Sequence, residues 1–336
     1  MSRILQIANY KPGMGGISGQ VEKIHTCLDG EGIDNAIFSV KGSVLYRIKS
    51  FFKLIKFGKY YDVFHVHTCS QGGFVSAVIG ITVGRILKKR IVLTYHGGGG
   101  ESFFEKHTRF VKFFLLKTDV NIALSGFIGN VFERFSIPYV EMPNIIELDG
   151  SRFRERETIE PKFISIRTLS PLYNIECIIN AFQIVKSQFP HASLTIVGGG
   201  PSRESLEKLV EDLHLKDVRF TGRVDNSHIY EYLDDADVML SVPRIDNMPV
   251  SVLEGMNAGL LVISSNVGGI PYMIKDGVNG LLFPSDEFEK LAEKMIIAVQ
   301  NQEKSKAMIC EAYKGLGKYS WASVKQKLLH VYAGER

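Results

Sequence analysis

Cysteines are few in this sequence of 336 residues, and its longest apolar run is short. The cysteines lie far apart and form no CxxC pair, which argues against a disulfide framework or a structural zinc site and favours a reducing, cytoplasmic environment. They are Cys27, Cys69, Cys177 and Cys310. No signal peptide is visible at the start. The run from Gly72 to Leu87 is too short for a membrane span and contains Arg85, so we expect a buried helix there.

Charge is divided unevenly along the chain. Residues 1–155 carry 20 Lys and Arg against 13 Asp and Glu (net +7), and residues 156–336 carry 20 against 23 (net −3), which sum to the overall +4. The basic half indicates an anionic partner or a solvated surface, and it lacks the aromatic motif that nucleic acid needs. Basic and apolar side chains interleave over 45–59. This segment either meets an anionic membrane surface or forms a solvated helix face.

Short apolar runs alternate with helix-length amphipathic stretches, which predicts an α/β fold with parallel sheets. The first predicted strands are 3–9, 36–40, 63–67, 91–95, 120–124 and 139–142. A polar stretch at 146–161 is typical of an interdomain linker. The second set of strands is 162–167, 193–197, 218–221, 238–242, 261–264 and 280–283. We therefore expect two Rossmann-like domains, 1–157 and 158–318, facing each other across a ligand cleft at the carboxyl ends of both sheets.

The most informative motif runs from Arg244 to Gly280. Asp246 precedes Glu254 by eight positions, and a Gly-Gly-Ile-Pro turn follows at 268–271. This pattern resembles the signature of the family 4 (group 1) glycosyltransferases, in which a Glu-x7-Glu pair grips a nucleotide sugar. The resemblance implies a GT-B fold whose last helix, here in 319–336, crosses back to the first domain. It also implies retaining transfer of a sugar from a nucleotide diphosphate sugar to a hydroxyl acceptor, in cell-surface polysaccharide or glycolipid synthesis.

Two acids and one arginine are the predicted centre of this chemistry. Glu254 either accepts hydrogen bonds from the donor ribose, as the resemblance implies, or stabilises the first turn of its own helix. Asp246 stands where the family has its first Glu, near the transferred sugar, and the alternative is an Asx turn. Arg167 resembles the Arg of the family's Arg-x5-Lys segment, which clamps the diphosphate; the alternative is a surface arginine at a strand end. The Lys position is Tyr173, which leaves two outcomes open: slow turnover, or another cation in the gap.

Glycine-rich loops and turn amides supply the other contacts that the resemblance implies. A strand closes and a helix opens at Gly198–Pro201, where a backbone approaches a phosphate or base, and the loop with Gly222 and Arg223 borders the base. The predicted donor-binding set is Gly15, Gly16, Tyr173, Gly199, Gly200, Gly222, Arg223, Asn247, Met248, Pro249 and Val250. The loop at 13–18 also approaches a dinucleotide fingerprint, but the second strand ends in Ser39-Val40-Lys41 without the required acid, which disfavours a dehydrogenase.

Three histidines invite a metal hypothesis. His65 and His67 share one face of a strand, and His96 ends the next one, so zinc and a cleft wall without metal are the alternatives. The resemblance places His96 beside the transferred sugar, and we predict it as a catalytic residue with Arg167, Asp246 and Glu254. The acids of 235–237 resemble a metal-binding Asp-x-Asp but precede a strand instead of following it, so we predict no metal and no cofactor besides the donor.

Three other classes of protein compete with the transferase. A catalytically weakened GT-B protein would act as a nucleotide-sugar-binding or scaffold partner, and Tyr173 and Asp246 support it. A phosphorylase-like enzyme needs a pyridoxal-binding lysine segment, and none is apparent. A zinc hydrolase would use the three histidines. We expect a cytoplasmic protein, either free or peripheral at the inner face of the membrane, whose partners are a nucleotide sugar and a carbohydrate or lipid-linked acceptor.

Overall fold

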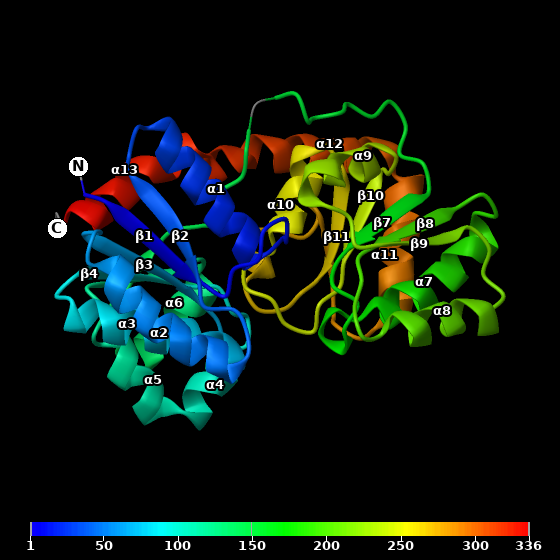
Figure 1. Cartoon of the computed structure of the whole chain (residues 1–336). Helices are drawn as coiled ribbons and strands as arrows, with labels where there is room; N and C mark the ends of the chain where they lie inside the picture. The colour runs from blue at the N-terminus through cyan, green and yellow to red at the C-terminus, as the bar shows by residue number, and fades with distance from the viewer. Residues whose placement is uncertain (1, 149, 335–336) are drawn as a thin grey trace. The chain divides into compact units, whose positions relative to one another are not determined.

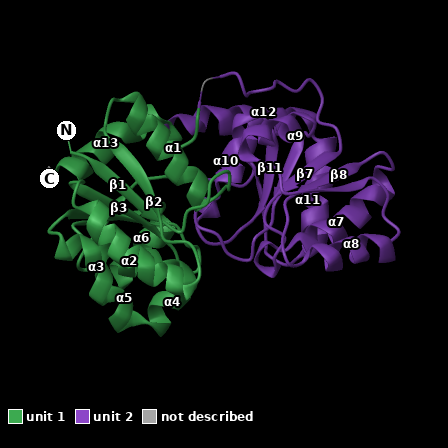
Figure 2. Cartoon of the chain, viewed as in Figure 1, with its two compact units in different colours: residues 1–147, 319–336 green, residues 148–318 purple. Residues whose placement is uncertain are grey.

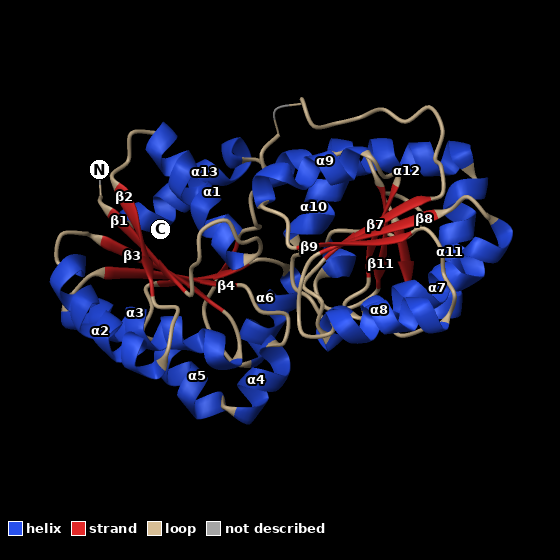
Figure 3. Ribbon diagram, turned by 45° about the vertical axis from the view of Figure 1, so that its right-hand side comes forward, coloured by secondary structure: helices blue, strands red, loops and turns tan. Residues whose placement is uncertain are grey.

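The computed structural model describes residues 2–148 and 150–334, which form two compact units (Figure 2). The first unit contains residues 1–147 and 319–336, and the second contains residues 148–318. Each unit holds one six-stranded parallel sheet with helices on both faces (Figures 1 and 3). All twelve predicted strands are present. The α/β prediction is therefore confirmed for both halves of the chain.

The first sheet has the order β2-β1-β3-β4-β5-β6. Its strands are β1 (Ile4–Ala8), β2 (Asn35–Ser39), β3 (Val63–Thr68), β4 (Arg90–Tyr95), β5 (Val120–Ala123) and β6 (Val140–Glu141). The helices of this unit are α1 (Ile17–Gly30), α2 (Val44–Gly58), α3 (Val75–Ile86), α4 (Gly100–Lys106), α5 (Thr108–Leu115), α6 (Gly126–Arg134) and α13 (Trp321–Ala333). All these strands are parallel, and the order in which the chain adds strands to the sheet reverses between β1 and β3.

Alternate side chains of the first sheet enter two separate cores. Leu5 and Phe64 pack with residues of α2, α3 and α5 on one face. Ile4 and Val63 pack with residues of α1 and α13 on the other face, and Figure 1 shows these two helices side by side. This is the two-residue period of a strand buried on both faces. The last helix thus belongs to the first unit, although 171 residues of the second unit (148–318) precede it.

The second sheet has the order β12-β11-β10-β7-β8-β9. Its strands are β7 (Lys162–Ile166), β8 (Ser193–Val197), β9 (Val218–Gly222), β10 (Val238–Ser241), β11 (Leu261–Ser265) and β12 (Leu281–Phe283). Its helices are α7 (Ile175–Gln188), α8 (Arg203–Asp212), α9 (Ile229–Asp234), α10 (Val250–Asn257), α11 (Phe288–Gln300) and α12 (Gln302–Lys314). Counted within the unit this is the order 3-2-1-4-5-6 of the Rossmann fold, which reverses between β7 and β10.

The expected boundary at residue 157 differs from the division that the structure shows. Residues 148–157 belong to the second unit, because the arginines of this polar stretch bind there. Arg156 is buried and donates to the carbonyls of Ala236 and Ala258 at 2.7 Å each. It also donates through Nε to Asp237 Oδ1 at 2.9 Å. A charge-dense sequence is typical of a linker, but here its charges are paired inside a domain.

The apolar run at 72–87 forms a short 3-10 turn, Gln71–Phe74, and helix α3. Most residues of α3 are buried against the first sheet, as expected. Among residues 2–148 and 150–334, no helix has both the length and the apolarity needed to cross a membrane.

Candidate active site

The second sheet concentrates the predicted donor residues where its strand order reverses. Parallel α/β sheets bind ligands outside the carboxyl ends of the strands at such a switch point. Arg167 directly follows β7, and Asp246 lies in the loop after β10. The two strands are neighbours in the sheet, so their following loops lie beside each other. Sequence positions 79 residues apart thus meet at one point of the fold.

Arg167 and Asp246 form a largely buried ion pair. Arg167 Nη1 lies 3.1 Å from Asp246 Oδ2, and their side chains are only 10% and 18% exposed. Arg167 Nη2 donates to Ser241 Oγ at 2.8 Å, and the guanidinium lies over the Tyr173 ring, 5.1 Å from its centroid. Arg167 Nε is buried and has no hydrogen-bond partner among the described residues. Because a buried N–H is rarely left unpaired, this atom marks a place for a ligand acceptor or water.

The loop after β10 is fixed by the second half of the motif. The Asn247 N–H donates to Asp246 Oδ1 at 2.8 Å, and the Gly269 N–H donates to the Asp246 carbonyl at 2.9 Å. Gly268 has φ +56°, and a Cβ there would lie 2.0 Å from the same carbonyl. Glycine is therefore required at this close approach. The contact explains why the motif joins an acid near 246 to a Gly-Gly turn more than twenty residues later.

Glu254 is the fifth residue of α10, after Pro249 at the N-cap and Val250 at the first position. The alternative in which it stabilises the first turn of its helix is therefore wrong, because the first turn holds no acid. Its side chain is 7% exposed. Met248, which leads into this helix, is also buried.

The glycine loop after β8 lies against the chain that leaves β7. A Cβ at Gly198 or Gly200 would come within 1.8 Å of the Arg167 carbonyl or 2.2 Å of the Leu169 carbonyl. Gly199 instead faces the side chain of Arg223, which follows Gly222 at the end of β9. The structure therefore brings Arg167, Tyr173 and Asp246 together at the switch point, and it brings Gly199 to Arg223 beside them. The glycines keep the Arg167 backbone close to the neighbouring loop.

In the first unit, the loop with Gly15 and Gly16 lies between β1 and α1, also at a switch point. Gly16 is the N-cap of α1 with φ +65°, and a Cβ there would meet open space. The Gly13 N–H donates to Glu22 Oε1 at 3.1 Å, so this amide already has an anionic partner. The Lys11 N–H is also paired, with Ser18 Oγ at 3.1 Å, which leaves the amides of Gly15 and Gly16 at the start of α1 as the ones suited to bind a ligand.

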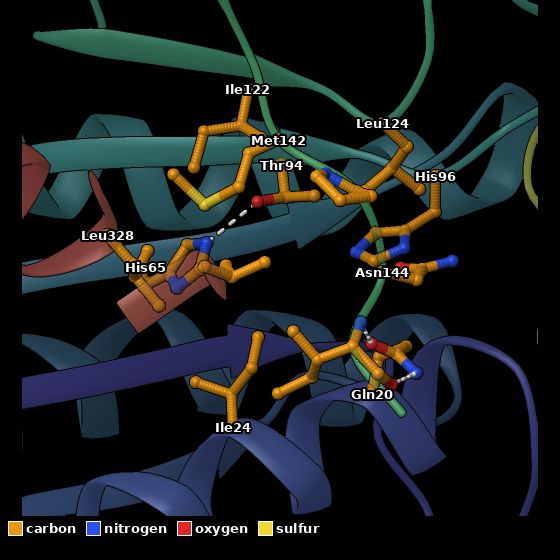
Figure 4. Close-up of a pocket in the computed structure, with 13 residues that line it drawn as sticks. Gln20, Ile24, His65, Thr94, His96, Ile122, Leu124, Met142, Asn144 and Leu328 are labelled. Atoms are coloured by element: carbon orange, nitrogen blue, oxygen red, sulfur yellow. Dashed lines mark hydrogen bonds between the residues drawn. The ribbon is translucent and has the colours of Figure 1, made fainter. Parts of the chain in front are cut away.

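The three histidines form a chain in which His65 and His67 of β3 are buried and His96, directly after β4, is partly buried. His65 Nδ1 lies 2.7 Å from Tyr332 Oη of α13, and its Nε2 lies 2.8 Å from Thr94 Oγ1. His67 Nδ1 lies 3.0 Å from His96 Nε2. His65 and His96 line a small cavity of about 20 Å³, the space of about one water molecule; Figure 4 shows Asn144 and Met142 beside them.

Burial keeps these histidines neutral. It lowers the pKa of His65 to about 3, with a smaller contribution from His96, and it lowers the pKa of His96 to about 3. Burial, then the neighbouring His65 and His96, holds the pKa of His67 well below its usual range. Four of their ring nitrogens contact one another or the hydroxyls of Thr94 and Tyr332, while buried His67 Nε2 has no hydrogen-bond partner among the described residues.

The second metal hypothesis concerned the acids at 235–237. Asp237 Oδ1 accepts hydrogen bonds from Arg154 and Arg156, and its Oδ2 accepts from the Glu160 N–H. Both carboxylate oxygens therefore have protein partners. Within 2–148 and 150–334, no group of three His, Cys, Asp or Glu side chains is placed to hold a metal ion.

One charged residue near the switch point was missed from sequence. Arg244 lies after β10, two positions before Asp246, and its backbone N–H donates to the Leu172 carbonyl at 2.8 Å. Its side chain pairs with Asp286, Nη2 to Oδ1 at 2.9 Å. A basic residue inside the acid motif was the only available signal.

The chain is similar to several known proteins. Residues 151–315 match the family model described as glycosyl transferases group 1. The second unit matches the group 1 glycosyltransferases. A relative from Bacillus anthracis, N-acetyl-alpha-D-glucosaminyl L-malate synthase, is 25% identical over 72% of this chain and 66% of its own length. The amylovoran biosynthesis glycosyltransferase AmsK of Erwinia amylovora is 24% identical over 72% of this chain and 62% of its own length. The chain thus spans slightly less than two thirds of these relatives.

Solved structures match over nearly the whole chain. The structure of Anabaena Alr3699/HepE, in a complex with UDP and glucose, has a TM-score of 0.80 at 17% identity. The match covers 99% of this chain and 100% of the HepE chain. Sucrose-phosphate synthase from Thermosynechococcus elongatus has a TM-score of 0.81 at 16% identity, with 99% of each chain covered. At this identity the likeness shows the fold alone, and that fold is the two-unit GT-B fold expected from the sequence.

Proposed function

We propose that the protein is a retaining glycosyltransferase of family 4 that moves a hexose from a nucleotide diphosphate sugar to a hydroxyl acceptor. The observation that carries the proposal is the buried Arg167–Asp246 pair at the switch point of the second sheet, inside the segment that matches the group 1 glycosyltransferases. The relative AmsK is named for amylovoran biosynthesis. A Mycobacterium tuberculosis relative, 25% identical over 193 residues, is named as a phosphatidylinositol monomannoside mannosyltransferase. These names favour polysaccharide or glycolipid synthesis as the setting.

In the proposed reaction the bond between the anomeric carbon and the diphosphate oxygen breaks, and its electron pair stays on that oxygen. The acceptor oxygen forms the new bond on the same face of the sugar and gives its proton to the departing phosphate. Arg167, with Nε unpaired in the described structure, stabilises the charge that grows on the leaving group. Asp246 holds Arg167 in place and faces the sugar. Glu254 accepts hydrogen bonds from the ribose diol, for which an ionised carboxylate is suited.

The remaining predicted residues have binding roles. The amides of Asn247 to Val250 and of Gly199 and Gly200 bind the sugar and phosphates, while Gly222 and Arg223 border the base. In the first unit, His96 and the amides of Gly15 and Gly16 contact the transferred sugar. His96 acts as a neutral ring, because burial keeps its pKa at about 3, so it donates or accepts a hydrogen bond without adding charge. Neither a metal ion nor a cofactor is needed for these steps.

We also propose that the first unit binds an anionic membrane surface, which would place a cytoplasmic protein at the inner face of the membrane. Helix α2 exposes several large apolar side chains, among them Val44 (74%) and Phe52 (65%). Lys49, Lys53 and Lys56 interleave with them along the same helix. Helix α5, which joins the same core, exposes Phe113 (56%) beside Lys117. Apolar and basic side chains together favour a membrane surface over a purely solvated face.

The alternative of a weakened, scaffold-like protein is not favoured, because the relatives are named as transferases or synthases.

A thermal-shift screen against UDP, GDP, ADP and CMP, each with and without EDTA, tests the donor site. A ligand at 100 times its Kd adds ~2.7 kcal/mol to the free energy of unfolding. A shift with one nucleoside diphosphate, unchanged by EDTA, followed by sugar transfer from the matching donor, supports the proposal. No shift with any of the four contradicts it.

Glu254→Gln provides the test of the site itself. This change removes the charge of a buried acceptor without changing its shape, so we expect donor affinity or rate to fall about 10-fold or more, the size of a charge-assisted hydrogen bond. Kinetics with the donor found in the screen measure the effect. Wild-type transfer by the variant would refute the role of Glu254.

A further inference from the structure

We infer that Arg244 is the second cation that binds the donor's diphosphate, in the gap that Tyr173 leaves. The inference rests on the proposed function, because it assigns a residue to the same site. The resemblance implies two cations at the diphosphate, Arg167 and a lysine, but residue 173 is a tyrosine whose ring stacks on Arg167. A hydroxyl donates one hydrogen bond and brings no charge. One positive charge is therefore missing where the leaving group gains negative charge.

Arg244 lies against the same turn as Tyr173. The turn Pro171–Tyr173 follows β7, and the Arg244 backbone N–H donates to the Leu172 carbonyl at 2.8 Å. The Arg244 guanidinium also donates through Nη1 to the Pro171 carbonyl. A residue of the loop after β10 thus brings its charge to the turn after β7. The turn after β7 is where the sequence would carry the missing lysine. Arg244 reaches this turn from the loop after the neighbouring strand, β10.

The fold makes this place a ligand site independently of the resemblance. The strand order of the second sheet reverses between β7 and β10, and ligands of such sheets bind outside the carboxyl ends at that point. Arg167 leaves β7 there, and Arg244 leaves β10 there. The buried Nε of Arg167 lacks a partner among the described residues, which marks the same point for an acceptor group.

The two arginines differ in how firmly they are held. Arg167 is 10% exposed and is held by Asp246 and by Ser241. Arg244 is 43% exposed, and its partner Asp286 is 54% exposed, so solvent weakens their ion pair. A guanidinium binds a phosphate in a fork of two hydrogen bonds. Arg244 is therefore able to exchange Asp286 for the diphosphate, whereas Arg167 stays with its own carboxylate.

Asp286 is the competing anion in the unliganded protein. Its Oδ1 accepts from Asn174 Nδ2 at 2.8 Å as well as from Arg244. Asn174 directly follows Tyr173, so the carboxylate holds the turn and the arginine together. When the diphosphate takes Arg244, Asp286 keeps Asn174. The Asp286 side chain thus controls how strongly Arg244 binds phosphate.

The test uses the full chain and calorimetric Kd values for UDP, GDP and ADP. Arg244→Gln should weaken the nucleoside diphosphate that binds the wild type by about 10- to 100-fold, the range expected for hydrogen bonds to a charged group. The matched control is Arg219→Gln, which removes the same charge from β9, where Arg219 lies over the Tyr232 ring. It should bind as the wild type does. Transfer rates should fall with Arg244→Gln and not with the control.

Two further variants separate a phosphate contact from a purely structural role. Adding Tyr173→Lys to Arg244→Gln should restore most of the lost affinity, because the lysine returns the charge to the same turn. Asp286→Asn should tighten diphosphate binding several-fold, because it removes the competing anion; asparagine also tolerates the positive φ of +68° at this residue. A structural role for the Arg244–Asp286 pair predicts weaker binding and no rescue.

The outcomes distinguish this inference from the proposed function. If the wild type binds none of the three nucleotides, the proposed function fails and the role of Arg244 fails with it. If the wild type binds one of them and Arg244→Gln binds it equally well, only the role of Arg244 is refuted. Weaker binding by Arg244→Gln without rescue by Tyr173→Lys, in a variant with unchanged melting temperature, also refutes it.

Discussion

The buried histidines predict that the first unit loses stability as the pH falls below neutrality. His65, His67 and His96 stay neutral in the fold because burial depresses each pKa, to about 3 for His65 and His96. In the unfolded chain a histidine has a pKa of about 6.5. Below that pH the unfolded state binds protons that the folded state does not, so protons favour unfolding. Stability is therefore fully present above about pH 7.5 and falls through the window from about 6.5 to about 3.

The size of the loss follows from the same difference. Between pH 7.5 and 5.5, each histidine that is protonated only in the unfolded chain lowers the free energy of unfolding by about 1.4 kcal/mol. Three such residues give about 4 kcal/mol, a large part of the 5–15 kcal/mol that is typical of domains. Carboxylates have ordinary pKa values near 4 and contribute little in this interval.

Trp321 allows the measurement to be made on the first unit. It is the only tryptophan in the sequence, lies in α13, and donates through Nε1 to Glu31 at 3.1 Å. Urea unfolding followed by its fluorescence at pH 7.5 and 5.5 gives the two free energies. His67→Gln should recover about a third of the pH effect, whereas His107→Gln, which changes an exposed histidine, should recover none. A wild-type difference below about 1 kcal/mol would show that the rings take up protons in the folded state and would refute the explanation.

Three other perturbations follow from individual contacts. Asp237→Asn should lower the free energy of unfolding of the second unit by about 3–5 kcal/mol, because it leaves the buried Arg156 without its carboxylate partner; Asp235→Asn, at an exposed neighbour, should change it by less than about 0.5 kcal/mol in urea unfolding. Gly200→Ala puts a methyl group against a backbone carbonyl and should cost more stability than Gly199→Ala, which meets a flexible side chain; equal melting temperatures would contradict this. Phe52→Ser should reduce sedimentation with vesicles containing anionic lipid and leave the Kd for the donor nucleotide unchanged, and undiminished sedimentation would refute a membrane role for α2.

The alternation of apolar runs predicted every strand, because a parallel sheet buried on both faces needs near-continuous apolar segments. The boundary near residue 157 was misplaced for a physical reason as well. The polar composition of 148–157 suggested a linker, but composition does not reveal whether Arg154 and Arg156 have partners in a domain. In the structure both bind Asp237, and Arg156 also binds backbone carbonyls. The partners lie about eighty residues later, and only the folded sheet brings them near.

Glu254 and Arg244 show the same limit within the site. The motif located Glu254 and left two roles open, of which the first-turn role is wrong because α10 begins at Val250, four residues earlier; several residues of this stretch, Asn247 and Ser251 among them, are suited to an N-cap, so the sequence alone does not fix the start of the helix. Arg244 carries no pattern of its own. Its significance depends on β10 lying next to β7, which brings the Arg244 backbone to Leu172. Strand order is set by tertiary packing, and local sequence does not encode it.

The two departures from the family pattern are parts of one arrangement around Arg167. Asp246, one methylene shorter than glutamate, reaches Arg167 Nη1 at 3.1 Å, while Tyr173 stacks on the same guanidinium. Here the acid, the ring and the hydroxyl of Ser241 all contact one arginine, and its buried Nε has no hydrogen-bond partner among the described residues. Arg244, which we propose as the second cation of this site, is more exposed and less firmly paired. This division favours a transferase with redistributed positive charge over a protein that has lost its chemistry.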